Sequence, residues 1–296
     1  MALWYDEVHE ERTRSGLRVE RTLYAGRSDY QRIEVLETPE FGRVLVLDGV
    51  FNTSEGDEHF YHEMLVQPAL TTARRARRVL IIGGGDGGTA REVLRHSTVE
   101  HVVMVEIDEQ VVRVCQEHLR AIGTAWDDPR LELRFEDGVR FVREADVEPF
   151  DVVILDGTDP IGAGEGLFGL EFYRGCDRVL ADGGVFALQS ASPILQKEIF
   201  LGVQQGLRKV FSEVHPYFGP VPLYAAGVWS WTWAARGGDP KTPDPTRAAV
   251  AEAQARYYNR DIHTAAFALP TELRTALRRA GAADEDIDGT PRPPAE

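Results

Sequence analysis

The fold follows from the stretch Val79-Leu80-Ile81-Ile82-Gly83-Gly84-Gly85-Asp86-Gly87-Gly88, an apolar run that ends in a glycine cluster. The next residues, 89–95, have the pattern of a helix. Glycines between a strand and a helix allow a tight turn and let a ligand approach the backbone without meeting Cβ atoms. Glu106 closes the following apolar run, 20 positions after Asp86, where a carboxylate can accept hydrogen bonds from both hydroxyls of a ribose. The stretch predicts a nucleoside site; a glycine turn that serves packing alone is the alternative.

Strand and helix patterns alternate downstream of this loop. Apolar runs predict further strands at 102–105, 131–135, 152–155 and 185–188, with helical stretches between most of them. Such alternation, with strands that are apolar throughout, is typical of a parallel, doubly wound sheet that helices cover on both faces.

The chain before the glycine loop has a different pattern. Polar and apolar residues roughly alternate in the runs 17–24, 30–36 and 44–47, which predicts a small antiparallel β region. We therefore predict an α/β protein with an N-terminal β domain at 1–60 and a Rossmann-like catalytic domain at 61–281. Residues 282–296 are acidic and rich in proline, which is typical of a disordered tail.

Composition and charge argue against several classes of protein. The chain has 296 residues, 43% of them hydrophobic, and a net charge of −15, so we expect no nucleic-acid partner. No signal-peptide pattern opens the chain, and no apolar run approaches the ~20 residues of a membrane span. Cys115 and Cys176 lie far apart in segments with helical patterns, which fits a reducing compartment. We expect a cytoplasmic protein without a membrane partner.

The carboxylate of Asp86 narrows the choice of nucleoside. Inside the loop it would repel the pyrophosphate of a dinucleotide and attract a cation. It therefore favours an adenosyl sulfonium that carries an ammonium group, and it opposes ordinary S-adenosylmethionine, whose carboxylate lies beside that amine. Asp137-Gly138, after the run 131–135, suits a carboxylate that accepts a hydrogen bond from the adenine amino group; a simple turn acid is the alternative.

A second acidic motif, Asp156-Gly157-Thr158-Asp159-Pro160, follows the run 152–155, and ligands of open α/β sheets lie beyond such carboxyl ends. An alkyl amine has a pKa of about 10, so it is a cation at pH 7. Carboxylates can hold and orient this cation and accept its proton, although a turn and a helix cap are the alternative.

The motif His59-Phe60-Tyr61-His62-Glu63 raises the hypothesis of a zinc site. The two histidines would need a further ligand, and the sequence does not mark one. Tyr61 and His62 suit hydrogen bonds between the two domains instead.

Several motifs occur together in order: Phe41-Gly42-Arg43-Val44-Leu45-Val46-Leu47-Asp48-Gly49, Asp57-Glu58-x-x-Tyr61-His62-Glu63, Gly83 to Gly88, Glu106-Ile107-Asp108, Asp156-x-x-Asp159-Pro160-x-Gly162 and Tyr257-Tyr258-Asn259. From about Trp4 to Leu277 the chain resembles the spermidine synthases, or polyamine aminopropyltransferases. The resemblance implies a methyltransferase-type sheet and a homodimer or homotetramer. It also implies transfer of an aminopropyl group from decarboxylated S-adenosylmethionine to putrescine, giving spermidine and methylthioadenosine.

The resemblance further implies roles for single residues. Donor binding is assigned to Gln31, Asp86, Glu106, Asp137 and Gly138, beside the glycine loop of Gly83, Gly84, Gly85, Gly87 and Gly88. Asp156 is the expected catalytic proton acceptor, and the amine site is lined by Tyr61, His62, Asp159 and Tyr224. No metal or other cofactor is expected, because the donor is a co-substrate whose sulfonium departs as a neutral thioether.

Four residues depart from the common pattern of the family. Asn52 stands where Gln is common, Gly56 where Arg is common, Ala163 where Pro is frequent, and Ala191 where many relatives carry Glu. The last position is expected to anchor the far end of the amine. The sequence therefore does not decide whether the amine acceptor is putrescine, agmatine, cadaverine or a longer polyamine. Two other functions remain as alternatives, a methyltransferase and a non-catalytic polyamine sensor.

Overall fold

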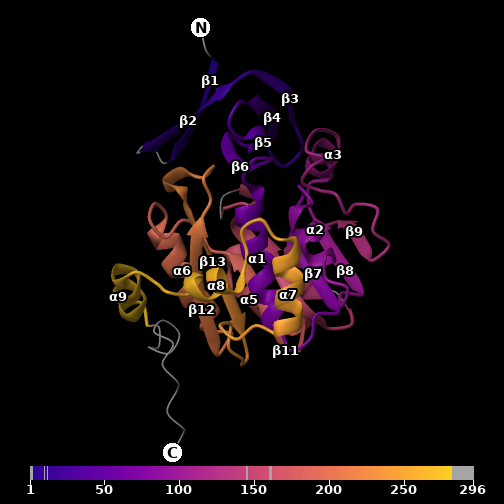
Figure 1. Ribbon diagram of the computed structural model, residues 1–296, viewed down its shortest axis with the longest axis vertical. Helices are drawn as coiled ribbons and strands as arrows, with labels where there is room; N and C mark the ends of the chain where they lie inside the picture. Colours follow the sequence, from indigo (N-terminus) through magenta and orange to yellow (C-terminus); the bar gives the residue numbers. More distant parts are fainter. Residues whose placement is uncertain (1–2, 10, 12, 145, 160–161, 282–296) are drawn as a thin grey trace, which may run out of the picture.

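The computed structural model describes residues 3–9, 11, 13–144, 146–159 and 162–281 (Figure 1). Their largest element is a seven-stranded sheet with the strand order β12-β13-β11-β10-β7-β8-β9. The strands are β7 Arg78–Gly83, β8 His101–Glu106, β9 Leu131–Phe135, β10 Phe150–Asp156, β11 Leu180–Gln189, β12 Glu213–Pro220 and β13 Val228–Ala235. β10 runs parallel to both of its neighbours, and β13 is antiparallel to β11 and β12. The predicted, mostly parallel α/β sheet is confirmed.

Helices cover both faces of this sheet because its strands are apolar on both sides. Along β7, Val79 and Ile81 belong to one buried cluster, whereas Leu80 and Ile82 belong to another. The first cluster includes residues of α1 (Glu58–Thr72) and α7 (Pro245–Gln254), and the second includes residues of α4 (Gly138–Glu144), α5 (Leu170–Val179) and α6 (Lys197–Leu207). The other helices of the described part are α2 Gly88–Leu94, α3 Glu109–His118, α8 Arg260–Ala266 and α9 Thr271–Arg279, with short 3-10 helices η1 Gly162–Phe168 and η2 Ala225–Gly227.

A small antiparallel unit precedes the large sheet, as predicted. In it, β1 Leu3–His9 pairs with β2 Thr13–Val19, and a four-stranded sheet contains β3 Arg21–Arg27, β4 Arg32–Thr38, β5 Gly42–Leu47 and β6 Val50–Ser54. The prediction of one strand over 17–24 is wrong. Val19 pairs with Leu3 of β1, whereas Arg21 pairs with Glu37 of β4, so the chain passes from one sheet to the other at Glu20.

The antiparallel unit lies at the end of the large sheet where the parallel strands finish, at the top of Figure 1, and α1 connects the two units. Because α1 begins at Glu58, the domain boundary that we predict at residue 60 falls in its first turn and stays a prediction. The predicted tail at 282–296, and Pro160 of the second acidic motif, lie outside the described residues. Among the described helices, none combines the length and the apolar character that a membrane crossing needs.

The C-terminal segment is tied to α1 through one buried carboxylate, that of Glu63. Its Oε2 accepts hydrogen bonds from the backbone N–H groups of Tyr257 at 2.8 Å and Tyr258 at 2.7 Å, and its Oε1 accepts one from Arg256 at 2.8 Å. Two motifs that lie far apart in the sequence therefore meet, and this contact holds α1 in place beneath the site.

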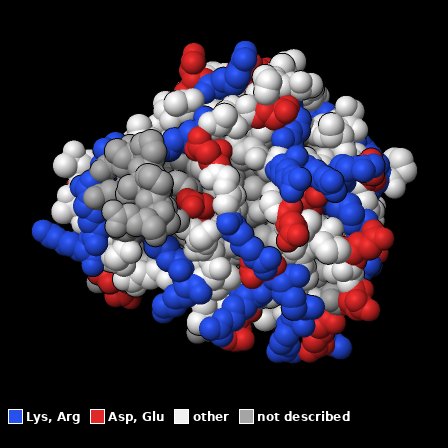
Figure 2. Space-filling view, turned by 90° about the horizontal axis from the view of Figure 1, so that it is seen from below, with Lys and Arg blue, Asp and Glu red and all other residues white. Residues whose placement is uncertain are grey.

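The face of the molecule opposite the antiparallel unit mixes charges of both signs (Figure 2). Arginines beside the strand ends pair locally with acids, as Arg77 does with Glu100 and Arg236 with Asp177. Such pairs offset the positive charge on this face. The expected absence of a nucleic-acid partner stays a prediction.

Candidate active site

Two adjoining cavities lie between the carboxyl ends of the parallel strands and the antiparallel unit. Gln31, Tyr61 and Tyr224 line both of them. The first cavity also contains most of the residues that the sequence singles out, namely His62, Gly83, Gly84, Gly85, Asp86, Glu106, Asp137, Gly138 and Asp156. The second contains Asp159. Every side chain that we assign to the site thus reaches a cavity wall, whereas Gly87 and Gly88 lead the chain into α2.

The glycine loop brings β7 and α2 close to other parts of the site. Gly83 has a φ of +83°, and a Cβ there would lie 2.1 Å from the carbonyl oxygen of Asp156. At Gly88 a Cβ would lie 2.3 Å from Cε1 of His62. These two glycines therefore serve close contacts within the protein, while Gly84 and Gly85 face the first cavity and leave room for a ligand.

Glu106 closes β8 at the floor of the first cavity. Burial raises the pKa of its carboxyl to about 7, and its Oε1 accepts a hydrogen bond of 2.9 Å from the backbone N–H of Asp108. Asp108 in turn accepts hydrogen bonds from Ser28 at 2.6 Å and from Gln31 at 2.9 Å. Asp108 therefore fixes Gln31, which belongs to the antiparallel unit, next to the carboxylate expected to bind the ribose.

Asp137 and Gly138 lie in the wall of the same cavity, at the start of α4. Oδ1 of Asp137 accepts hydrogen bonds from the backbone N–H groups of Val139 at 2.8 Å and Arg140 at 3.3 Å. The alternative interpretation of Asp137 as a simple turn acid therefore fits one of its two oxygens. Because the residue also lines the cavity, capping and contact with an adenine are compatible.

Asp156 lies at the centre of a buried polar cluster at the end of β10. Its Oδ1 accepts a hydrogen bond of 2.9 Å from the hydroxyl of Tyr61, and its Oδ2 accepts one of 2.7 Å from Thr89. Burial raises the pKa of Asp156, while the neighbouring His62 opposes that rise. Two donors thus fix the orientation of this carboxylate. The sequence analysis did not single out Thr89.

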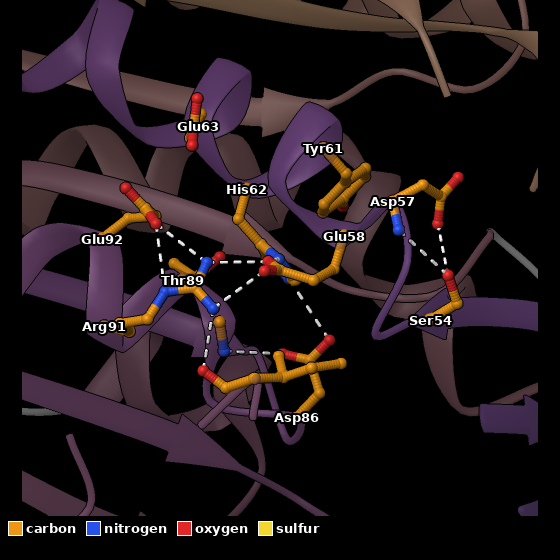
Figure 3. A network of polar contacts seen from close by, with 12 residues as sticks. Ser54, Asp57, Glu58, Tyr61, His62, Glu63, Asp86, Thr89, Arg91 and Glu92 are labelled. Atoms are coloured by element: carbon orange, nitrogen blue, oxygen red, sulfur yellow. Dashed lines mark hydrogen bonds and ion pairs between the residues drawn. The ribbon is translucent and has the colours of Figure 1, made fainter. Parts of the chain in front are cut away.

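His62 joins two carboxylates. Its Nδ1 lies 2.7 Å from Oε2 of Glu58, and its Nε2 lies 3.2 Å from Oδ2 of Asp86 (Figure 3). Burial disfavours the charged imidazole, but Asp86 and Glu58 outweigh it and raise the pKa of His62 well above its usual value. Oδ1 of Asp86 accepts a hydrogen bond of 2.8 Å from the backbone N–H of Gly88.

The same residues raise the question of a metal. Ligand atoms of His62, Asp86 and Asp156 all lie within 4.8 Å of one another. However, an imidazole whose two nitrogens both donate to carboxylates has no lone pair for a cation. His59, the other histidine of the weaker zinc hypothesis, packs on Phe60 with the ring centroids 4.5 Å apart. The donor set therefore suits cationic organic ligands better than a metal ion.

The second cavity has acidic and aromatic walls. Oδ2 of Asp159 accepts a hydrogen bond of 2.6 Å from Gln196, and burial raises the pKa of its carboxyl. The hydroxyl of Tyr224 donates to the backbone oxygen of Asn52 at 2.7 Å, and its ring lies edge-on to Trp229 at 4.7 Å between centroids. An elongated amine would thus meet a carboxylate between aromatic surfaces, which suits a cation on an alkyl chain.

Glu7, which the sequence analysis missed, also lines this cavity. It is only 2% exposed, burial raises its pKa to about 7, and its Oε1 lies 3.0 Å from Nε2 of His9. Its Oε2 has no hydrogen-bond partner among the described residues. Ala191, where the family commonly has Glu, is buried with a φ of +64°. Glu7 therefore supplies a carboxylate to this cavity. In the sequence, Glu7 could have been found from its position in the alternating pattern of β1, on the same face as Tyr5 and His9.

Comparison with known proteins supports this picture. Residues 58–241 match the model of the spermine/spermidine synthase domain, and residues 3–55 match that of the spermidine synthase tetramerisation domain. The chain belongs to the spermine/spermidine synthase family. The family predicted from the motifs is therefore confirmed.

Relatives in this family match nearly the whole chain. A polyamine aminopropyltransferase of Prochlorococcus marinus (strain MIT 9313) is 44% identical over 277 residues, which cover 93% of this chain and 96% of the relative. One from Halorhodospira halophila is 44% identical over 274 residues, covering 92% and 99%. The crystal structure of spermidine synthase from Thermotoga maritima has a TM-score of 0.89 at 38% identity and covers 94% of both chains. A spermidine synthase in complex with the transition state analogue AdoDATO has a TM-score of 0.90 at 38% identity, covering 94% of this chain and 95% of the other.

Proposed function

We propose that this chain is a polyamine aminopropyltransferase that moves the aminopropyl group of decarboxylated S-adenosylmethionine onto putrescine. The observation that carries the proposal is the arrangement of carboxylates along two connected cavities. Asp86 and Asp156 lie in the wall of the first cavity, and Asp159 and Glu7 lie in the adjoining cavity. Both substrates are cations with several positive centres, and each centre can meet a carboxylate along this path.

The first cavity suits the adenosyl donor. Glu106 would accept the ribose hydroxyls, Asp137 and Gly138 would lie beside the adenine, and Asp86 would bind the ammonium of the aminopropyl group. The carboxylate of Asp86 lies against the same loop, where it would repel the carboxylate of intact S-adenosylmethionine. This charge selection supports a decarboxylated donor and disfavours the methyltransferase alternative.

The reaction we propose is a direct displacement. The lone pair of the amine nitrogen attacks the aminopropyl carbon next to the sulfonium, the carbon–sulfur bond breaks, and methylthioadenosine leaves as a neutral thioether. Making the amine neutral at pH 7 costs about 4 kcal/mol. Asp156 would accept the proton of the amine, held for this role by Tyr61 and Thr89. We propose that no metal takes part, because the leaving group needs no Lewis acid and His62 has no free lone pair.

Acceptor choice depends on the far end of the second cavity. A diamine whose near nitrogen lies at Asp156 and Asp159 would reach toward Glu7 with its second ammonium. Glu7 would thus do what a Glu at position 191 is expected to do elsewhere in the family. The second candidate function is the same transfer to agmatine, cadaverine or a longer polyamine, since position 191 is Ala in this chain.

The test is a chromatographic assay for methylthioadenosine, with purified protein, one donor and one amine at a time. We expect product from decarboxylated S-adenosylmethionine with putrescine, and none when S-adenosylmethionine replaces it. Product with another amine alone would select the second candidate. Donor binding without product from any amine would contradict the enzyme and favour a polyamine sensor.

The oligomer we propose is a homodimer or homotetramer. The match of residues 3–55 to a tetramerisation domain supports self-association. The β1–β2 hairpin also exposes the apolar side chains of Leu3, Trp4 and Val8, which are 58%, 60% and 57% exposed in the single chain. Light scattering coupled to gel filtration would distinguish the two states. A cytoplasmic location remains part of the proposal.

A further inference from the structure

A continuous series of buried charges connects Arg91 of α2, through Glu58 and His62 of α1, to Asp86 of the glycine loop (Figure 3). Arg91 binds Glu58 through two nitrogens, with Nη1 3.0 Å from Oε1 and Nη2 2.7 Å from Oε2. The same Oε2 of Glu58 lies 2.7 Å from Nδ1 of His62, whose other nitrogen faces Asp86 at 3.2 Å. Glu58 is 7% exposed and His62 is 1% exposed, so water screens these contacts little.

The geometry of His62 requires a proton on both ring nitrogens. A neutral imidazole has one N–H donor and one acceptor nitrogen, whereas the imidazolium has two donors. Each nitrogen of His62 faces a carboxylate oxygen, so a neutral ring would place a lone pair against one of them. His62 is therefore an imidazolium in this arrangement, and Glu58 supplies one of its two anionic partners.

We propose that Glu58, fixed by Arg91, is a positioning residue that holds His62 as an oriented imidazolium beside Asp86 and Asp156, where its positive charge favours the carboxylate form of Asp156 for the cationic substrates. The proposal rests on the function proposed above. It assigns a role in the reaction to a residue that is absent from the walls of both cavities and that, among the described residues, reaches the site through His62.

The need for such a cation comes from the closeness of the two acids. Ligand atoms of His62, Asp86 and Asp156 lie within 4.8 Å of one another, and two carboxylates this close resist being ionised together. Burial and the charge of Asp86 raise the pKa of Asp156, whereas His62 lowers it. Although burial opposes it, His62 and Arg91 bring the pKa of Glu58 down to about 2, so Glu58 is an anion throughout the working pH range.

The remaining charged groups around this series do not replace Glu58. Asp57, which precedes α1, accepts hydrogen bonds from the hydroxyl of Ser54 at 2.6 Å and from the backbone N–H of Leu223 at 2.7 Å. Arg91 has a second carboxylate partner, Glu92, whose Oε1 lies 2.8 Å from Nη2. Glu92 also binds Arg95 at 2.7 Å and does not contact His62 in the described structure. Glu92 thus offers a matched control, because it is also buried and bound to the same arginine.

The test compares Glu58→Gln with Glu92→Gln in kcat/KM measured against pH with decarboxylated S-adenosylmethionine and putrescine. Without Glu58 the pKa of His62 falls, and Asp156 then loses a neighbouring cation. The acid limb of the profile should therefore move to higher pH by on the order of one unit, with a fall of up to about tenfold at pH values on that limb. Glu92→Gln should leave the limb in place, even if it lowers thermal stability.

Nitrogen-15 spectra of histidine-labelled protein give a readout independent of activity, with the His62 signal assigned from a His62→Gln sample. In the wild-type chain both ring nitrogens should remain protonated at pH 8, and in Glu58→Gln the ring should titrate at a lower pH. A neutral His62 in the wild-type chain at that pH overturns the proposal, whether or not the variant folds. If Glu58→Gln lowers the rate by the same factor at all pH values and leaves the acid limb in place, as is expected of Glu92→Gln, the proposal is also overturned. If the wild-type chain transfers no aminopropyl group, the spectra still decide the state of His62, so the two failures are distinguishable.

Discussion

Replacing Asp156 by Asn removes the proposed proton acceptor while keeping the size of the side chain. The amide oxygen can still accept the hydrogen bond of Tyr61, which is 2.9 Å long in the native site. The amide nitrogen would face Thr89, whose hydroxyl now donates to Asp156 at 2.7 Å and can rotate to accept instead. Both hydrogen bonds thus keep a partner but lose the charge that strengthens them, a structural loss of about 1 kcal/mol, equivalent to about fivefold in rate.

The chemical loss is much larger. A positioned general base contributes about a hundredfold to ten-thousandfold in rate, and the neutral amine that it helps to form lies about 4 kcal/mol above the ammonium at pH 7. We therefore expect kcat of Asp156→Asn to fall by about a thousandfold. Donor affinity should change little, because Glu106 and Asp137, the expected ribose and adenine contacts in the first cavity, are left in place.

The assay follows methylthioadenosine by chromatography at saturating donor and amine, and calorimetry gives the donor affinity. Thr89→Val is the matched control, since it removes one hydrogen bond to Asp156 and leaves its charge; we expect a loss of about fivefold. If Asp156→Asn loses no more than this control, Asp156 is not the proton acceptor and the proposed mechanism is wrong.

Three further perturbations test the substrate contacts. Asp86→Asn should weaken binding of decarboxylated S-adenosylmethionine by on the order of tenfold to a hundredfold and leave intact S-adenosylmethionine unaffected or tighter; an unchanged ratio of the two affinities, measured by calorimetry, refutes charge selection. Glu7→Gln should raise KM for putrescine by about tenfold without changing the rate with butylamine, which lacks the second ammonium; an equal effect on both amines would place Glu7 outside the acceptor site. Because burial raises the pKa of Glu106 to about 7, its carboxylate gains a proton as the pH falls from 8 to 6 and becomes a weaker acceptor for ribose hydroxyls. As the pH falls over that interval, donor affinity should therefore decrease in the wild-type protein but not in Glu106→Gln. The same dependence of donor affinity on pH in the two proteins would contradict the ribose contact.

The motifs alone predicted most of the residues that meet in the candidate site, because the determining signals are local. Continuous apolar runs identify β7, β8 and β10, and the carboxyl ends of neighbouring parallel strands meet at one edge of the sheet. Residues that follow those runs, such as Asp86 and Asp156, must therefore lie close together. The small antiparallel region was likewise predicted from a local signal, the alternation of polar and apolar residues. Its exact strand limits were not predicted. The break at Glu20 depends on which strand each half pairs with, and that is not encoded by alternation.

The sequence by itself determined the family, the α/β fold and the acids that follow the central parallel strands, since spacing and strand pattern are properties of a continuous segment. Only the tertiary structure placed Glu7 in the second cavity, joined Asp108 to Gln31 across the two units, and linked Arg91 to His62 through Glu58. A single acid in a strand or in the first turn of a helix has the same local pattern whether it faces water or a site. Its role depends on what other segments bring against it, and that depends on how the antiparallel unit and α1 pack onto the end of the sheet.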